Sequence, residues 1–362
     1  MRQQLDVPMT TVAVLLSVFA VGGMVGLSVA GPAADRLGRK PVMLVSLAAH
    51  ALAMVAMGFA ATFPAWLAAM ALCGAFNPLY RVGADSMIAD LLPPAERAGG
   101  YALMRMISNL GIAFGPAIGG FVTSVSYDIA FYASAGASLA FGLLIAFGAR
   151  ETMPAPQAGR PRAAGSYAPV LRDGAFLLFV GTYALSGMAY ITLMTFLPVY
   201  VKENFGVIER QYGFIMATNA AMVVLFQFAV TRQTSRRPAP PMLTLGALFY
   251  AAGVGSVALG RGFPGFWLSM VILTIGELIM MPTSASLTAN LAPPELMGRY
   301  MGLYTLTWSI GMGVGPDRRR AAQRPHRPGR HVVRRGGPGS GLGRRLSGSR
   351  PQWPPARAPV AA

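Results

Sequence analysis

The sequence predicts an all-α polytopic membrane protein built from two repeated halves. Of its 362 residues, 54% are hydrophobic and only 12% are charged, a balance typical of membrane proteins. Ten segments are long and apolar enough to cross a bilayer, and many residues recur at a distance of 200 positions. The single cysteine, Cys73, lies in one of the apolar segments, so no disulfide framework is expected.

The predicted spans each contain about 20 residues, the length that a helix needs to cross the hydrocarbon core. They cover residues 8–30, 41–62, 64–90, 100–124, 128–148, 174–200, 212–231, 242–261, 264–289 and 299–316. Residues 149–173, between the fifth and sixth spans, are rich in Pro, Gly, Ala and Arg, which indicates a flexible linker. The predicted domains are therefore residues 1–148 and residues 174–316, joined by this linker.

Basic residues in the short loops predict the orientation. Twelve lie on one side of the predicted membrane: Arg36, Arg39, Lys40, Arg97, Arg150, Arg160, Arg162, Arg172, Arg232, Arg236, Arg237 and Arg299. The other side carries four: Arg2, Lys202, Arg210 and Arg261. Because cytoplasmic loops are enriched in Lys and Arg, we expect the first side, with the linker, to face the cytoplasm.

The repeat is visible in prolines and glycines as well as in apolar residues. The matched positions include Pro41 with Pro241, Pro64 with Pro264, Pro93 with Pro293, Pro94 with Pro294, Gly111 with Gly311, Gly115 with Gly315 and Pro116 with Pro316. Apolar composition alone would not align five prolines without a gap, so we infer a duplicated unit.

The most specific motif, with the spacing G-x-x-x-D-R-x-G-R-K, joins the first two spans and predicts a tight turn. It consists of Gly31, Asp35, Arg36, Gly38, Arg39 and Lys40. Gly31 permits close approach of another backbone, and Gly38 can adopt a positive φ. Asp35 can accept hydrogen bonds at a helix N-terminus. The motif resembles the signature loop between the second and third helices of the major facilitator superfamily of transporters; a generic basic loop would require neither the glycines nor the acid.

This resemblance implies a major-facilitator-type two-half helical bundle with about ten of the family's twelve helices. One predicted span precedes the signature loop, where the family has two, and no twelfth span follows residue 316. We therefore expect the family's first and twelfth helices to be missing from this chain. The resemblance also implies a transporter rather than an enzyme, without cofactor or metal and acting as a monomer. The sequence agrees, because it has neither a metal-ligand cluster nor a glycine-rich phosphate loop.

The C-terminal residues, 317–362, differ in composition from the rest of the chain. They hold 12 of the 30 basic residues and one of the 13 acids, with abundant Pro, Gly and Ala. These residue types share GC-rich codons, so we expect an out-of-frame, disordered tail. A nucleic-acid-binding arm and an anionic-lipid anchor are the alternatives, but the last span would deliver the tail to the outer face. We therefore expect no nucleic-acid partner.

A second motif in the span 100–124 consists of Gly111, Gly115, Pro116, Gly119 and Gly120. Small residues at this spacing let two helices approach closely, and a proline permits a bend. The motif resembles the antiporter signature of the superfamily's drug:proton exporters, with Ala102 in place of its first glycine. The resemblance implies an antiporter, and helix packing alone is the alternative.

Ionisable residues inside a membrane span are costly and usually functional, and Arg81, Asp85 and Glu277 are the candidates among them. Arg81 and Asp85 are four residues apart, so they share a helix face and can pair, and Glu277 lies midway along its span. The resemblance places their helices around the central cavity and implies substrate-binding and proton-coupling roles. Tyrosines such as Tyr190 favour a bulky, partly apolar ligand. A static ion pair beside a neutral, hydrogen-bonded Glu277 is the alternative.

The resemblance further implies a latch between the two halves. In the family, the second arginine of the signature loop pairs with an acid at the end of the fourth helix, where this chain has Asp90. The loop aspartate faces the start of the eleventh helix. Here Arg39 would meet Asp90, and Asp35 would lie near Gly298 and Arg299. Such a latch would stabilise the outward-facing state.

The sequence thus predicts a proton-coupled secondary transporter that exports small, partly apolar molecules by alternating access. The expected partners are the lipid bilayer of a bacterial-type cell membrane, a small-molecule substrate and protons. A sugar or metabolite facilitator or importer of the same fold is one alternative, and a non-transporting remnant or interaction protein is another. A test of proton dependence distinguishes the predicted antiporter from the first alternative. A test of ligand-dependent flux distinguishes it from the second.

Overall fold

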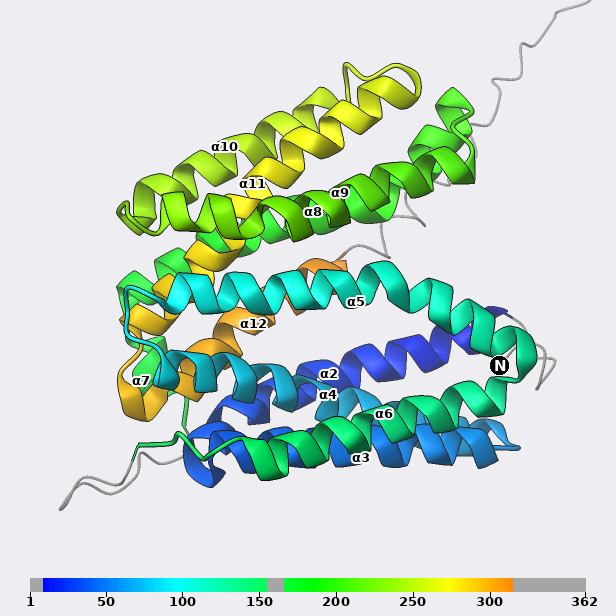
Figure 1. Cartoon of the computed structure of the whole chain (residues 1–362), viewed down its shortest axis with the longest axis vertical. Coiled ribbons are helices and arrows are strands. Elements are labelled where there is room, and N and C mark those ends of the chain that lie inside the picture. Colours follow the sequence, from blue (N-terminus) through cyan, green and yellow to red (C-terminus); the bar gives the residue numbers. More distant parts are fainter. Residues whose placement is uncertain (1–8, 155–165, 315–362) are drawn as a thin grey trace, which may run out of the picture. The chain divides into compact units, whose positions relative to one another are not determined.

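The computed structural model describes residues 9–154 and 166–314; the predicted tail at 317–362 lies outside them. Contacts divide the chain into two compact units, Met1–Arg319 and Arg320–Ala362, and every described helix belongs to the first unit. Within the described residues, all regular structure is helical (Figure 1). The long helices are α2 (Met9–Leu37), α3 (Arg39–Phe59), α4 (Phe63–Leu91), α5 (Arg97–Val125), α6 (Tyr127–Gly148), α8 (Gly174–Phe205), α9 (Glu209–Thr234), α10 (Ala239–Ser256), α11 (Gly262–Leu291) and α12 (Met297–Val314), and the short ones are α7 (Ala168–Leu171) and the 3-10 helix η1 (Pro294–Leu296).

The ten long helices coincide with the ten predicted spans to within several residues at each end. Seven of them are long and apolar enough to cross a membrane by length and composition. The other three are α4, which carries Arg81 and Asp85 in its interior, and the 18-residue helices α10 and α12. The prediction of an all-α polytopic membrane protein is confirmed.

The signature motif forms less of a loop than its sequence predicts. Helix α2 continues to Leu37 and α3 begins at Arg39, so the turn is the single residue Gly38, with φ 109°. This backbone conformation suits glycine, which has no Cβ. A Cβ on Gly38 would also lie 2.4 Å from Oε2 of Glu151. The prediction of a turn across the whole motif is therefore wrong, since Gly31, Asp35 and their neighbours are helical.

The offset of 200 residues recurs in the helices. The paired starts are residues 9 and 209, 39 and 239, 63 and 262, and 97 and 297. Helix α5 packs against α9, and its counterpart α12 packs against α2, so the two halves meet through equivalent pairs. Within each half, α3 contacts α4 as α10 contacts α11, and Figure 1 shows α10 and α11 side by side.

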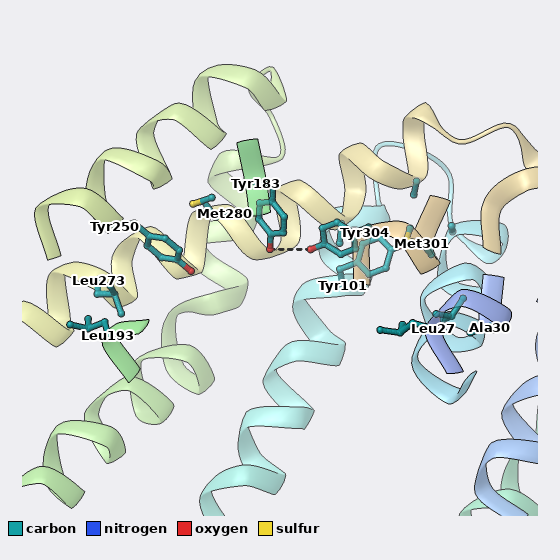
Figure 2. Packing of buried hydrophobic residues seen from close by; sticks show 14 of the residues in the cluster. Leu27, Ala30, Tyr101, Tyr183, Leu193, Tyr250, Leu273, Met280, Met301 and Tyr304 are labelled. Carbon is teal, nitrogen blue, oxygen red and sulfur yellow. Dashed lines mark hydrogen bonds between the residues drawn. The ribbon is translucent and has the colours of Figure 1, made fainter. Parts of the chain in front are cut away.

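Buried apolar residues from both halves form one large cluster. Figure 2 shows Leu27 and Ala30 of α2 in this cluster together with Tyr101 of α5, Tyr183 of α8 and Tyr304 of α12. The core therefore lies at the junction of the halves, around the helices that carry the predicted site residues.

Candidate functional site

A cavity of about 360 Å³ lies among α4, α5, α8, α11 and α12. Its charged lining residues are Arg81, Asp85, Arg105 and Glu277. The structure thus brings the three predicted coupling residues around one space. It adds Arg105, which the sequence analysis did not single out.

Glu277 is the centre of a polar network that joins the two halves. Its side chain is buried, and Oε1 forms an ion pair with Arg105 of α5 and accepts a hydrogen bond from the Tyr190 hydroxyl at 3.2 Å. Oε2 accepts a bond from Asn219 Nδ2 at 2.7 Å, and the same amide donates to Thr274 Oγ1 at 2.9 Å. A buried carboxylate is tolerated when it is paired and hydrogen-bonded in this way.

The second ion pair in the cavity lies along one face of α4. Arg81 Nε donates to Asp85 Oδ2 at 2.8 Å, at the i, i+4 spacing that the sequence indicated. Asp85 is buried, whereas the Arg81 side chain is exposed to the cavity. The hydroxyl of Tyr101 donates to the backbone carbonyl of Asp85 at 2.8 Å and so links α5 to α4.

Aromatic side chains connect α8 to α12 beside this cavity. The rings of Tyr183 and Tyr304 stack with centroids 5.3 Å apart, and their hydroxyl groups lie 3.3 Å apart (Figure 2). The Tyr304 hydroxyl also lies 2.9 Å from Ser284 Oγ of α11. Tyr304 lines the cavity, so this contact fixes part of its wall.

The second candidate site is the crossing of α2 and α12, which we call the latch. Asp35 accepts hydrogen bonds from the backbone amides of Gly298 at 2.7 Å and Arg299 at 3.2 Å. These amides belong to the first turn of α12, where N–H groups lack helical partners and the helix dipole favours an anion. Asp35 and Arg299 are both buried, whereas Arg36 is exposed.

Arg39 extends the latch from the first turn of α3. Its Nε donates to Asp90 Oδ2 at 2.9 Å, and Nη1 donates to the carbonyl of Ala34 at 2.8 Å. Its Nη2 reaches the carbonyl of Pro294 at 3.4 Å, in the second half. Asp90 Oδ2 also accepts a bond from Thr152 Oγ1 at 3.2 Å, which ties the linker to the same group.

Glycines allow the two latch helices to touch backbone to backbone. A Cβ on Gly298 would lie 2.6 Å from the carbonyl oxygen of Gly31. The Tyr167 side chain packs at this crossing, and its hydroxyl donates to the carbonyl of Leu27 at 3.3 Å. Burial raises the pKa of Tyr167 to about 12, so the phenol remains a neutral donor.

Glu151, at the start of the linker, caps the N-terminus of α3. Its Oε1 accepts bonds from the amides of Arg39, Thr152 and Met153 at 3.0, 2.9 and 2.8 Å, and Oε2 accepts one from Lys40 at 3.0 Å. Burial opposes ionisation, but the four N–H donors outweigh it and lower the pKa of this carboxyl.

Two further contacts lie close to the latch. Arg97 Nη1 donates to the carbonyl of Ala289 at 2.8 Å and to Asn290 Oδ1 at 2.9 Å, at the C-terminal end of α11. Asp173 accepts from the amide of Phe176 at 3.0 Å and from the Tyr300 hydroxyl at 2.8 Å, which joins the start of α8 to α12.

The glycines of the predicted antiporter motif are not in close contact with a helix. At Gly111, Gly115, Gly119 and Gly120 an added Cβ would meet nothing within 4 Å among the described residues. The side chain of Pro116 lies outside what the structure describes. The close packing expected at this motif is therefore absent from the described part of the chain.

Sequence reasoning missed several residues of these sites. Arg105 is a charge inside the predicted span 100–124, and that signal alone could have identified it. Asn219 is likewise a polar residue inside a span. Glu151 gave no comparable signal, because its bond to Arg39 joins residues 112 positions apart. Over residues 9–154 and 166–314, no group of three His, Cys, Asp or Glu side chains could hold a metal ion.

Comparisons with known proteins agree with this architecture. The family model of the Major Facilitator Superfamily matches residues 1–316. The Na(+), Li(+), K(+)/H(+) antiporter of Planococcus maritimus is 26% identical over 321 residues, which cover 78% of this chain and 74% of that protein. The multidrug resistance protein MdtH of Escherichia coli O1:K1 / APEC is 26% identical over 295 residues, covering 80% and 72% of the two chains.

Solved structures share the fold at lower sequence identity. The human organic anion transporter MFSD10 (TETRAN) gives a TM-score of 0.71 at 21% identity, covering 83% of this chain and 75% of that one. A bacterial homologue of the iron transporter ferroportin, in its outward-facing state, gives 0.70 at 15% identity, with coverage of 88% and 85%. The chain is therefore a multi-pass membrane protein of the Major Facilitator Superfamily, whose members are transporters rather than enzymes.

Proposed function

We propose that this transporter exports small, partly apolar molecules in exchange for protons, by alternating access across a bacterial cell membrane. The observation that carries the proposal is Glu277, a buried carboxylate on the cavity whose counter-charge, Arg105, belongs to the other half of the bundle. Ionisable groups in this situation commonly serve as proton carriers in transporters.

Protonation of Glu277 would act directly on the contact between the halves. In its ionised form the carboxylate satisfies Arg105, Tyr190 and Asn219. The neutral form would leave Arg105 buried without a counter-charge, and breaking a buried pair in this way costs roughly 3–5 kcal/mol. Proton binding would therefore favour a conformation in which Arg105 is hydrated or meets another anion.

The latch supports alternating access. The excess of basic residues predicts that Gly38 and the linker face the cytoplasm. Asp35, Arg39 and Arg97 then close the cytoplasmic side by contacts between the halves. In such an outward-facing arrangement the cavity would open to the outside, and the crossing of α2 and α12 would separate for release or uptake on the inside. The names of two relatives, a multidrug resistance protein and a cation/proton antiporter, agree with export and with proton exchange.

The exposed glycine-rich face of α5 suggests that a further helix packs against it. In the second half, α8 packs against α12, which repeats α5 at the offset of 200 residues. We propose that an equivalent helix packs on Gly111, Gly115 and Gly119 in the working transporter; the absence of the family's first and twelfth helices stays a prediction. The coding DNA tests it: the expected result is an apolar span upstream of codon 1 in frame and another after codon 316 in an alternative frame. Early stop codons in both places would contradict it.

The sign of a proton movement tests the function. The purified protein is reconstituted into liposomes that contain a pH-sensitive dye, and small aromatic solutes of each charge type, together with NaCl and KCl, are added outside. An antiporter exchanges the entering solute for lumenal protons, so the lumen becomes alkaline. A proton symporter would acidify the lumen, and a facilitator would leave its pH unchanged; either result would contradict the proposal. Protein-free liposomes give the signal from passive permeation.

A further inference from the structure

The charge that a solute can contact in the cavity is positive. The exposed fraction of the side chain is 52% for Arg81 and 16% for Arg105, against 2% for Asp85 and 4% for Glu277. All four residues line the cavity. A solute there can therefore reach the guanidinium of Arg81 but hardly either carboxylate.

Both carboxylates are shielded from a solute in the cavity. Both oxygens of Glu277 accept hydrogen bonds from protein groups. Asp85 Oδ2 accepts the bond from Arg81 Nε; its Oδ1 has no hydrogen-bond partner in the described part of the chain, but it is buried. A cationic solute would have to displace Arg105 to pair with Glu277, or enter a buried site to reach Asp85, and displacing a guanidinium would leave an arginine without its counter-charge.

Arg81, by contrast, keeps hydrogen-bonding capacity for a ligand. Its bond to Asp85 uses Nε, and in the part of the chain that the structure describes neither Nη nitrogen has a hydrogen-bond partner. A guanidinium binds carboxylate, sulfonate or phosphate oxygens through parallel N–H donors, and these charge-assisted bonds are the strong ones. Held at Nε by Asp85, the group is fixed in orientation before a ligand arrives.

The rest of the cavity surface suits an apolar body. The lining residues without charge include Ile112, Tyr190, Met281, Pro282, Ala285 and Tyr304. The volume of about 360 Å³ falls within the range of small-molecule sites, roughly 300–1,000 Å³. One accessible cation beside aromatic and aliphatic walls matches a molecule with one anionic group on an aromatic or aliphatic frame.

We propose that the substrates of this transporter are small amphiphilic organic anions, whose anionic group binds the outer guanidinium nitrogens of Arg81 while the apolar body packs against Tyr190 and Tyr304. This inference rests on the proposed function in taking the cavity as the transport site. It goes further because it assigns the charge of the substrate and the residue that binds the charged group.

A matched ligand pair tests the charge. The full chain is purified into lipid nanodiscs without any pH gradient, and equilibrium binding is measured for 2-naphthoate and for 2-naphthamide, which share the same ring system. Binding of the anion about tenfold or more tighter than the amide is expected, because charge-assisted hydrogen bonds are stronger than neutral ones. Equal affinities, or no binding of naphthoate up to about 10 mM, would overturn the proposal.

Substitutions assign the preference to Arg81. The double variant Arg81→Gln/Asp85→Asn removes the ion pair without leaving a buried carboxylate alone, and it should bind the two ligands with equal affinity. Arg81→Lys keeps a charge beside Asp85 and should weaken naphthoate binding alone, because an ammonium lacks the planar fork. The control is Arg232→Gln, an exposed position on α9 outside the cavity lining, which should change neither affinity. Should the double variant fail to fold, Arg81→Lys decides: unchanged naphthoate affinity contradicts the assignment.

This experiment is independent of the test of proton exchange. Equal binding of the two ligands would reject the anion assignment, whereas the sign of the lumenal pH change would still decide whether the protein is an antiporter. A proton-coupled signal with cationic solutes only would support the proposed function and overturn the inference.

Discussion

The crossing of α2 and α12 leaves no room for a side chain at Gly31, so Gly31→Ala is expected to open the latch. An added Cβ would lie 2.8 Å from the Cα of Arg299, 2.8 Å from the carbonyl oxygen of Gly298 and 2.7 Å from the Tyr167 hydroxyl. Two of these three atoms belong to the backbone, which cannot rotate away as a side chain does. The helices must therefore move apart.

The size of the effect follows from these distances. Favourable contacts between heavy atoms lie near 3.5–4.0 Å, so the helices would have to separate by roughly 0.7 Å or more. Overpacking of this kind typically costs about 1–3 kcal/mol. The strain exists only while the crossing is closed, so it shifts the equilibrium toward the open form by roughly 5–150-fold. The gain in helix propensity from Gly to Ala, about 0.5–1 kcal/mol, applies to both forms and cancels.

Pulsed electron paramagnetic resonance measures the shift. Spin labels at the exposed positions Leu37 and Glu295 report the separation of the two halves, in a background in which the buried Cys73 is replaced by serine. Gly31→Ala should populate a longer distance that is minor in the parent. The matched control is Gly136→Ala on α6, where an added Cβ meets nothing within 4 Å. A Gly31→Ala distribution identical to that of the parent would refute the reasoning.

Two further substitutions address the groups around the crossing. Asp35→Asn keeps the bulk but removes the charge that two amides of α12 bind, so transport should fall about tenfold while the amount in the membrane stays the same; flux at unchanged rate would contradict a gating role. Glu151→Gln should lower the melting temperature at pH 7, since the loss of a helix cap costs about 0.5–2 kcal/mol. The folded pKa of Glu151 lies below its ordinary value of about 4.3, so the cap contributes fully above pH 4.3 and is lost as the pH falls through the lower folded value. The difference in melting temperature between Glu151→Gln and the parent should shrink as the pH falls, whereas any small difference at the exposed control Glu203→Gln should not. A difference for Glu151→Gln that is independent of pH would count against the cap.

Local signals in the sequence predicted much of the fold. Helix positions follow from the length of the apolar segments. The repeat follows from prolines in the first turns of matching helices in both halves, such as Pro64 and Pro264. The pairing of Arg81 with Asp85 depends only on helical spacing. The positive φ of Gly38 is likewise a local property of the turn.

Local signals do not specify contacts between distant segments, and the long-range contacts of the latch, such as Arg39 with Asp90, were expected only from the family resemblance. Arg105 and Glu277 lie 172 positions apart on helices from different halves, and nothing local in either helix specifies the partner. Glu151 caps a helix whose first residue, Arg39, lies 112 positions earlier in the sequence. For the glycines of α5 the sequence predicts a contact that the structure lacks. Their spacing predicts close helix packing, but the described chain has no helix packed against them. Spacing specifies which face of a helix is small, but it does not specify what lies against that face.

The most direct test of proton coupling compares two transport modes in Glu277→Gln. Glutamine keeps the size and one acceptor of the side chain but cannot bind or release a proton. Uptake driven by a pH gradient should fall about tenfold or more, whereas exchange of labelled for unlabelled substrate without a gradient should persist, because exchange requires no net proton movement. An equal loss of both modes would reduce Glu277 to a structural role, and gradient-driven uptake at the parent rate would contradict proton coupling through this residue.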